Sequence, residues 1–327
     1  MSTESLEGLP SFSIVLETEN LANADIEGLS RSLHSLLEQD LSPKLAREVF
    51  LIESGDIPAP VLDRLREEFP WISVHPAPPD TGYYGAKMLG AKIATGEVIV
   101  YCDSDCVYEP RWLRALLTPF ASDPEIQVVA GETSTGGAGI YGTAMALTYI
   151  FPQYSRENSI APASGYFLNN VAFRRDFLLR YPIPDDLPLY RGNCVIHARE
   201  LCRAGQTIWR QPIARAKHAP PNGFHHFFWR FLLIGNDYYW QKCLLQKYEK
   251  DSSPKREYKS DATPTANQMT GIFSSRIGGM FRNDPRHIFF FPLALPIVLS
   301  SAFLIFIGYW ITAIAPEYLR AKYDEVL

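Results

Sequence analysis

The sequence predicts an α/β fold with a mostly parallel sheet, followed by a C-terminal transmembrane helix. Three features indicate this. Short apolar runs alternate with amphipathic helical patterns over the first 130 residues, an acidic pair directly follows one of these runs, and Ile288 to Ala315 contains no charged residue. Continuous apolar strands separated by amphipathic helices are typical of a parallel sheet that helices cover on both faces.

The apolar runs and the helical periodicity place the elements in order. Strands are expected at Phe12–Leu16, Glu48–Ile52, Trp71–His75 and Val98–Cys102. Helices are expected at Ala24–Gln39, Pro60–Phe69 and Tyr84–Thr95, with Gly96 as the C-cap of the last one. After a further helix and the strand Ile126–Ala130, residues 131–215 read as irregular, with helices at Arg174–Arg180 and Val195–Ala204.

Composition limits the function classes. The chain has 327 residues, of which 46% are hydrophobic, so it can bury a sizeable core and is neither disordered nor collagen-like. With 31 basic and 36 acidic residues it lacks the basic footprint of a nucleic-acid-binding protein. Five cysteines without a CxxC pair indicate a reduced compartment, with neither a disulfide framework nor a zinc site. The start MSTESLEGLPSF predicts no secretory signal.

The acidic pair is Asp103-Ser104-Asp105, directly after the apolar run VIVYC. Ligands of parallel sheets bind beyond the carboxyl ends of the strands, which is where these carboxylates fall. Their oxygens suit Mg²⁺ or Mn²⁺, and such a cation can neutralise the charge that builds on a leaving diphosphate. The structural alternative is an acidic turn that merely closes the strand.

Several segments resemble family 2 glycosyltransferases of the GT-A fold, over about residues 11–240. IVLETEN resembles the first strand and nucleotide loop of that family, and FLIESGD its second strand and acidic nucleoside loop. GAKMLGAKIATGEVIVYCDSD is similar to the helix, strand and DxD motif, NNVAFRRDF to a later element, and ARAKHAPP to the stretch that ends in a metal-binding histidine.

The resemblance implies a nucleotide-sugar site. Its residues would be Glu17, Glu19, Glu53, Lys87 and Asp103. Glu17 and Glu19 would border the nucleoside, and Glu53 would contact the base or the ribose. Lys87 or Lys92 would face the diphosphate, although a solvated helix face is the structural alternative for both lysines.

The resemblance also implies a metal site for Mn²⁺ or Mg²⁺. Asp103 would touch the ribose or the metal, Asp105 would coordinate the metal, and His218 would be the third protein ligand. A lone histidine is otherwise an ordinary surface or core residue.

One motif departs from the family. Where the family usually has a Glu-Asp pair with the catalytic base, this chain has Asn193 and Cys194. Asparagine cannot take a proton, and a thiol near its usual pKa is a poor base without an activating cation. The alternatives are Asp186, which lies nearer the altered motif, and Asp185. Two further candidates, His197 and Glu200, fall on the following helix, where a solvated face is the structural alternative.

The apolar run 288–315 is long enough to cross a bilayer. Pro292 and Pro296 leave a kinked span or a re-entrant hairpin open. Phe224–Trp240 is rich in aromatic residues, and it is either an interfacial helix or a helix packed on the catalytic domain. More basic residues precede the apolar run than follow it, which places the large domain in the cytoplasm.

The expected organisation has a GT-A domain over residues 1–248, with a nucleotide-binding part over 11–130 and an acceptor part over 131–248. A polar linker and juxtamembrane segment (249–287), the transmembrane segment (288–315) and a short tail (316–327) follow.

The predicted activity is metal-dependent, inverting transfer of a sugar from a nucleoside diphosphate to a lipid-linked or cell-envelope saccharide, with membrane lipids as a further partner. The alternative is a non-catalytic nucleotide-sugar-binding or scaffold subunit on the same fold. A nucleotidyltransferase is less consistent with the sequence, because TENLANAD offers no basic, glycine-rich phosphate loop.

Overall fold

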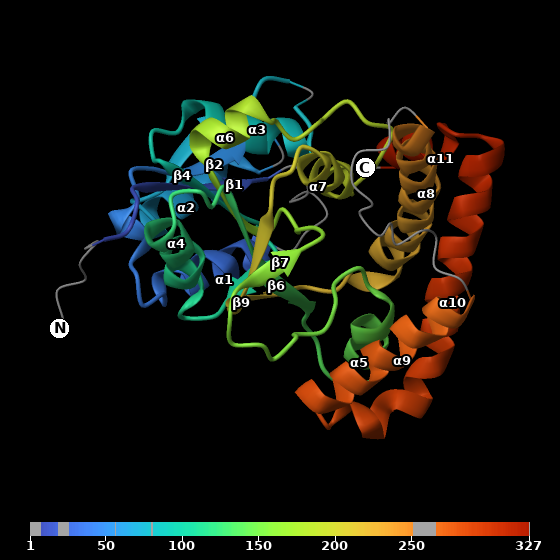
Figure 1. Cartoon of the computed structure of the whole chain (residues 1–327). Helices are drawn as coiled ribbons and strands as arrows, with labels where there is room; N and C mark the ends of the chain where they lie inside the picture. The colour runs from blue at the N-terminus through green and yellow to red at the C-terminus, as the bar shows by residue number, and fades with distance from the viewer. Residues whose placement is uncertain (1–7, 19–25, 56, 80, 251–265, 327) are drawn as a thin grey trace. The chain divides into compact units, whose positions relative to one another are not determined.

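The computed structural model describes residues 8–18, 26–55, 57–79, 81–250 and 266–326, which fall into two compact units (Figure 1). The first, here called the sheet unit, comprises Met1–Ser134, Ser155–Asp186 and Asn193–Ala219. The second, the helical unit, comprises Thr135–Tyr154, Leu187–Gly192 and Pro220–Leu327. The predicted acceptor part 131–248 is therefore divided between the two units.

One sheet of nine strands, counted over the described residues, forms the centre of the sheet unit. The strands are β1 (Phe12–Glu17), β2 (Val49–Glu53), β3 (Ser73–Pro76), β4 (Val98–Cys102), β5 (Cys106–Tyr108), β6 (Val128–Thr135), β7 (Ala161–Ala163), β8 (Asn170–Arg174) and β9 (Ile208–His218). Their order is β3-β2-β1-β4-β8-β6-β9-β5, and β7 pairs with β9.

Strand direction changes half-way across this sheet. The strands β3, β2, β1 and β4 are parallel, as predicted. From β4 onward the pairs β4–β8, β8–β6, β9–β5 and β9–β7 are antiparallel. The expected mostly parallel sheet is thus limited to its N-terminal half, because apolar runs reveal strands but not their direction.

Helices cover both faces of the sheet. They are α1 (Ile26–Leu37), α2 (Ala59–Glu68), α3 (Tyr83–Ile93), α4 (Trp112–Ser122), α6 (Arg175–Arg180) and α7 (Asn193–Arg203). Alternate strand residues point to opposite faces. Ile14 therefore packs in the core with residues of α1, α2 and α4, whereas Val15 packs in the core with residues of α3, α6 and α7.

The predicted role of Gly96 as a helix cap is wrong. Helix α3 ends earlier, and its C-cap is Ala94 in an extended conformation. Gly96 instead lies against β1, where a Cβ atom would come within 2.4 Å of the Phe12 carbonyl carbon. Its N–H donates to Ser13 Oγ at 2.9 Å. The glycine is required by close backbone packing at the start of β4.

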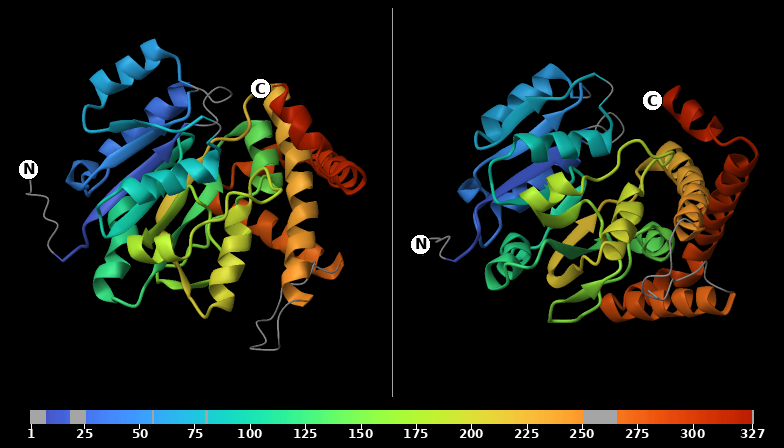
Figure 2. Two further views of the ribbon diagram at one scale, coloured as in Figure 1. Left: turned by 90° about the horizontal axis from the view of Figure 1, so that it is seen from above. Right: turned by 45° about the horizontal axis from the view of Figure 1, so that its top comes forward.

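The helical unit contains α5 (Gly139–Thr148), α8 (Gly223–Lys250), α9 (Ala266–Asn283), α10 (His287–Ile314) and α11 (Tyr318–Asp324). The predicted linker lies partly in residues 251–265, outside the described residues, and from Ala266 onward it is helical. The long helices α8 (gold to orange) and α10 (orange to red) pack against each other, as the right view of Figure 2 shows.

Two glycines allow the close approach of α8 and α10. A Cβ atom on Gly235 would lie 2.1 Å from the Ile305 carbonyl oxygen, and one on Gly308 would lie 2.0 Å from that of Leu232. Nearby, the Thr312 hydroxyl donates to Asn236 Oδ1 at 3.1 Å. Small residues permit this direct backbone contact between helices, as they do in membrane proteins.

Candidate functional site

Asp103 follows β4 at the edge of the sheet where the parallel strands end, and four neighbours fix it. Its backbone N–H donates to the Tyr108 hydroxyl at 2.8 Å, and its carbonyl accepts from Ser32 Oγ at 2.9 Å. Its carboxylate accepts from the Tyr83 hydroxyl at 2.9 and 3.0 Å and from Lys87 Nζ at 2.6 Å. The carboxylate is therefore held in one orientation before any ligand binds.

Lys87 is buried beneath this edge of the sheet, with no exposed surface. Burial opposes its charge, but the carboxylates of Asp103 and Glu17 outweigh that effect and raise the pKa of Lys87. The solvated helix face considered for Lys87 is wrong, because i and i+4 neighbours Tyr83 and Lys87 both point toward Asp103. By contrast, Lys92 is exposed.

Asp105 and His218 are brought together by the pairing of β5 with β9. This ladder places Cys106 opposite His218, and the Ala219 N–H donates to the Asp105 carbonyl at 2.8 Å. His218 Nε2 lies 3.1 Å from Asp105 Oδ2. His218 Nδ1 lies 2.5 Å from the Ala219 carbonyl, which can only accept, so Nδ1 carries the hydrogen and Nε2 is the atom that faces Asp105.

These atoms could hold a divalent cation. One ligand atom each from Asp105, Cys106 and His218 lie within 4.8 Å of one another. Burial raises the pKa of Cys106 well above its usual range, so its thiol stays protonated and is a weak ligand. The carboxylate suits Mg²⁺ or Mn²⁺, whereas the imidazole favours Mn²⁺, because Mg²⁺ prefers oxygen ligands.

Asp103 lies outside this group of ligand atoms, as far as the described residues go. Its carboxylate is instead paired with Lys87. The alternative predicted for Asp103, contact with the ribose, is therefore the better supported of its two roles.

Glu17 and Glu53, two further predicted nucleotide residues, lie at the same edge of the sheet. Glu17 ends β1 and is 2% exposed, and Glu53 ends β2. Glu53 Oε1 accepts from the N–H groups of Gly55 at 2.7 Å and Ile57 at 3.3 Å, so it organises the turn after β2. Glu19 lies outside the described residues. Contact of these residues with a nucleoside stays a prediction.

Asn193 and Cys194 begin α7, and Cys194 is not a suitable base. Burial raises the pKa of the Cys194 thiol to about 11, so it is protonated at neutral pH. Asn193 donates its N–H to the Tyr84 hydroxyl at 3.2 Å and its Nδ2 to the Pro184 carbonyl at 2.8 Å. In the part of the chain that the structure describes, Asn193 Oδ1 has no hydrogen-bond partner.

His197 is a core residue, so the solvated face considered for it is wrong. Its Nδ1 lies 2.6 Å from the Tyr166 hydroxyl and its Nε2 lies 2.9 Å from the Tyr181 carbonyl. Burial lowers the pKa of His197 to about 4. With both ring nitrogens engaged, His197 does not serve as the base, and Glu200 on the same helix is half-buried.

Asp185 and Asp186 are exposed in the loop between α6 and α7. Asp185 Oδ2 lies 3.5 Å from the position of a Cβ atom on Gly85, so its carboxylate rests on the first turn of α3. That turn carries Tyr83, which bonds Asp103. The structure therefore reverses the order of preference and favours Asp185 over Asp186.

Sequence reasoning missed Tyr83, Ser32 and Tyr108, the three hydroxyl residues that orient Asp103. The spacing of Tyr83 and Lys87 on one helix face was a usable signal. The other two come from distant elements, and only the fold brings them to the acidic pair.

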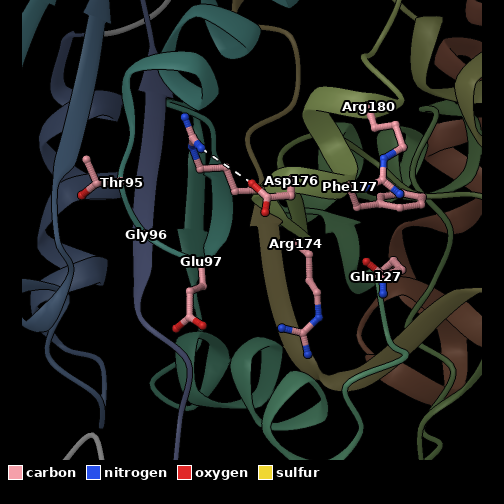
Figure 3. A pocket seen from close by; sticks show the side chains of 9 residues that line it. Thr95, Gly96, Glu97, Gln127, Arg174, Asp176, Phe177 and Arg180 are labelled. Atoms are coloured by element: carbon pink, nitrogen blue, oxygen red, sulfur yellow. Dashed lines mark ion pairs between the residues drawn. The ribbon is translucent and has the colours of Figure 1, made fainter.

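A polar pocket of about 430 Å³ lies at the opposite edge of the sheet, between the start of β4 and the end of β8 (Figure 3). It is lined by Thr95, Gly96, Glu97, Gln127, Arg174, Arg175, Asp176, Phe177 and Arg180. Arg174 donates to the carbonyls of Phe120 and Ile126, and Arg175 donates to those of Ala91 and Lys92. These arginines fasten helices to the sheet and are not part of the acidic site.

Residues 22–180 match the sequence model described as glycosyl transferase family 2. The matched segment is just under half of the chain. The resemblance inferred from the motifs is thereby confirmed.

The curated relatives are similar over a limited region. The chain is 29% identical over 126 residues to N-acetylgalactosaminyltransferase 4 of Drosophila melanogaster. It is 32% identical over 120 residues to polypeptide N-acetylgalactosaminyltransferase 10 of Homo sapiens. These matches cover 37% and 36% of this chain but only 19% of each relative. The chain thus spans about a fifth of the length of these relatives.

Two solved structures share the GT-A fold. The mannosyltransferase PcManGT from Pyrobaculum calidifontis, in complex with GDP-Man and Mn²⁺, has a TM-score of 0.60 and 16% identity, covering 94% of this chain and 88% of that one. GalNAc-T7 with UDP, GalNAc and Mn²⁺ has a TM-score of 0.53 and 15% identity, covering 83% and 55%. At these identities the likeness confirms the predicted fold alone.

The pair Lys87–Asp103 generates a stability prediction. Lys87→Met leaves the buried Glu17 and the partly buried Asp103 carboxylates without their cation, and we expect it to lower the free energy of unfolding by about 3–5 kcal/mol. Adding Asp103→Asn should recover part of this loss, because one of the uncompensated charges disappears. Urea denaturation measures both. Lys92→Met, on the exposed face of the same helix, is the control and should change stability by less than about 0.5 kcal/mol. Strict additivity of the two single substitutions would contradict the pairing.

His197 generates a pH prediction. Its folded pKa of about 4 lies below its ordinary value of 6.5, so between these pH values the unfolded chain binds more protons. Stability should therefore fall as the pH drops from about 6.5 to 4, by up to about 3 kcal/mol from this residue. His197→Gln should flatten that part of the stability–pH profile, whereas His225→Gln, at an exposed position, should not. An unchanged slope in His197→Gln would refute the assignment.

Proposed function

We propose that the chain is a metal-dependent glycosyltransferase that moves a sugar from a nucleoside diphosphate to an acceptor hydroxyl. The observation that carries the proposal is the 3.1 Å approach of His218 to Asp105, next to an Asp103 carboxylate locked by Lys87. The match of residues 22–180 to the family 2 model supports it, as do neighbours of the same fold that hold UDP or GDP-Man together with Mn²⁺.

Asp105 and His218 would hold the cation, with Nε2 as the imidazole ligand because Nδ1 is engaged with the Ala219 carbonyl. A bound Mn²⁺ supplies positive charge for the leaving diphosphate. The hydrogen bond from Nδ1 to the Ala219 carbonyl fixes the ring, which is the usual arrangement of a ligating histidine.

The donor nucleoside would bind at the ends of the parallel strands. Asp103 would accept a hydrogen bond from the ribose, and Glu17, Glu19 and Glu53 would border the base and ribose. Lys87 is the buried counter-charge that holds the Asp103 carboxylate in its orientation.

We place the acceptor next to Asp185. An inverting displacement needs a base within hydrogen-bond reach of the attacking hydroxyl. The Asp185 carboxylate rests on α3, one turn from Tyr83 and Asp103, and the Pro184 carbonyl next to it is held by Asn193. As this carboxylate takes the hydroxyl proton, the acceptor oxygen would bond to the anomeric carbon while the bond to the diphosphate breaks, and this single displacement would invert the anomeric configuration.

The acceptor itself would be a lipid-linked or cell-envelope saccharide. Support comes from α10, the single helix among the described residues that is long and apolar enough to cross a membrane. The excess of basic residues before α10 supports a cytoplasmic location for the sheet unit, where nucleotide sugars are made.

A second candidate function is a non-catalytic nucleotide-sugar-binding or scaffold subunit. The substitution of Asn193 and Cys194 for the usual acidic pair favours it, since neither side chain is a base at neutral pH. Donor binding without transfer to any acceptor, across a screen of nucleotide sugars with Mn²⁺ and lipid extract, would select this candidate.

The metal site generates the third prediction. Asp105→Asn and His218→Gln should each weaken Mn²⁺-dependent binding of UDP or GDP by about 10–100-fold, because each removes one ligand. Calorimetric titration with and without Mn²⁺ measures this. Asp176→Asn, at the opposite edge of the sheet, is the matched control and should bind normally. Wild-type affinity in folded Asp105→Asn would refute the site.

The base generates the fourth prediction. With a donor and acceptor found by the screen, Asp185→Asn should lower kcat by about 10²–10⁴-fold while donor affinity is kept. Its neighbour substitution Asp186→Asn and the buried Cys194→Ala should both stay within a few-fold of wild type. Loss of transfer in Asp186→Asn alone would return the role to Asp186. The anomeric configuration of the product, read by NMR, tests inversion separately.

A further inference from the structure

Helix α10 carries an apolar face along its whole length. Large side chains recur every three or four residues together with Pro296, and each of them is more than half exposed: Phe289, Leu293, Leu299, Phe303, Phe306, Trp310 and Ile314. This spacing puts them on one side of the helix. The opposite side carries small buried residues, Ala294, Ser301 and Gly308, that pack within the helical unit.

The N-terminal end of α10 is fastened to segment 135–154. His287 Nδ1 lies 2.8 Å from the Thr143 hydroxyl. Just before it in the chain, α9 makes the same attachment. Arg276 donates to the carbonyls of Ala146 at 3.1 Å and Phe151 at 2.5 Å, and Asn283 donates to that of Tyr154 at 3.2 Å.

The C-terminal end of α10 is fastened to segment 187–192 through α11. The rings of Tyr323 and Tyr190 lie 5.3 Å apart, edge to face. Arg320 donates to the Leu187 carbonyl at 3.5 Å. Leu319 and Tyr323 are buried against Leu232 of α8, so α11 is packed firmly at this end.

Segments 135–154 and 187–192 are short insertions between stretches of the sheet unit. Segment 187–192 leaves it after Asp186 and returns at Asn193, and segment 135–154 leaves it after Ser134 and returns at Ser155. A bilayer-crossing α10 would need one of these insertions to pass through about 30 Å of hydrocarbon and back.

Neither insertion is long enough. Six extended residues reach about 20 Å, less than one crossing. In segment 135–154 the ten residues of α5 rise only about 15 Å, and the rest reach about 35 Å, against about 60 Å for a round trip. Both ends of α10 must therefore lie on the side of the membrane that holds the sheet unit.

We propose that α10 lies in the plane of a membrane surface, with the face from Phe289 to Ile314 in lipid, instead of crossing it. The proposal rests on the membrane binding proposed above and replaces the predicted span 288–315. The exposed Arg282 at one end suits anionic headgroups, whereas the nearby Arg286 is paired with Asp284. Trp310 and Tyr318 at the other end suit the headgroup region, where aromatic residues gather.

The sidedness of the two helix ends tests the proposal. In a full-length chain carrying Cys202→Ala and Cys243→Ala, single cysteines are introduced by Arg286→Cys, Tyr318→Cys or, as a reference in the sheet unit, Lys92→Cys. The protein is bound to sealed vesicles of phosphatidylcholine and phosphatidylglycerol, and a membrane-impermeant maleimide is added outside. All three positions should react from the same side. Protection of either helix end while position 92 reacts would overturn the proposal.

Depth and affinity give a second test. A nitroxide attached in Phe303→Cys should report a depth of about 5–10 Å, not the bilayer centre. Phe303→Glu with Phe306→Glu should weaken vesicle flotation by at least about tenfold, because charges would enter lipid. Wild-type protein that fails to float with these vesicles would refute membrane binding, and donor titration with Mn²⁺ would still report on glycosyl transfer independently.

Discussion

The candidate site depends on the buried ammonium group of Lys87. The parallel strands β1 and β4 bring two acidic side chains, Glu17 and Asp103, to the same edge of the sheet, where their charges repel. Lys87 enters from α3 and lies fully buried against Asp103. A buried ion pair is tolerated only when its geometry is good and its other hydrogen bonds are made. Tyr83, on the same face of α3, completes those bonds, so the packing of this one helix decides whether the edge can carry its acidic residues.

This arrangement divides the work of the two aspartates. Four protein groups hydrogen-bond to Asp103, so its carboxylate is suited to orient a ligand and does not need to move when the ligand binds. Asp105 lies two residues on, where β5 turns the chain toward β9, and its partner His218 arrives from the end of that strand. The parallel half of the sheet thus positions Asp103, and the antiparallel half brings His218 to Asp105. The candidate metal ligands come together only because the strand direction changes.

The elements that depend on local residue patterns could be predicted from the sequence. The strands up to β4, the helices between them and the acidic pair follow from apolar runs and helical periodicity, and His218 was found through its motif. The burial of Lys87 could not be predicted, because a lysine on an amphipathic helix looks solvated until its carboxylate partners are placed. His197 was misjudged for the same reason. The attachments at the two ends of α10 could not be predicted either, because they are made by residues far away in the chain.

The segment that fastens the end of α10 also borders the candidate base. Residues 187–192 begin directly after Asp185 and Asp186 and end directly before Asn193. Within the helical unit, Asp237 of α8 accepts from the N–H groups of Tyr190 at 2.7 Å and Arg191 at 2.9 Å, so this segment is held by α8 as well as by α11. Burial raises the pKa of Asp237 to about 6, yet these N–H groups and Arg230 favour its charged form. The loop that carries the candidate base is therefore continuous with a segment fixed to α8 and α11. If α10 binds lipid as proposed, that binding would restrict the loop through the chain itself and limit the positions open to the Asp185 carboxylate.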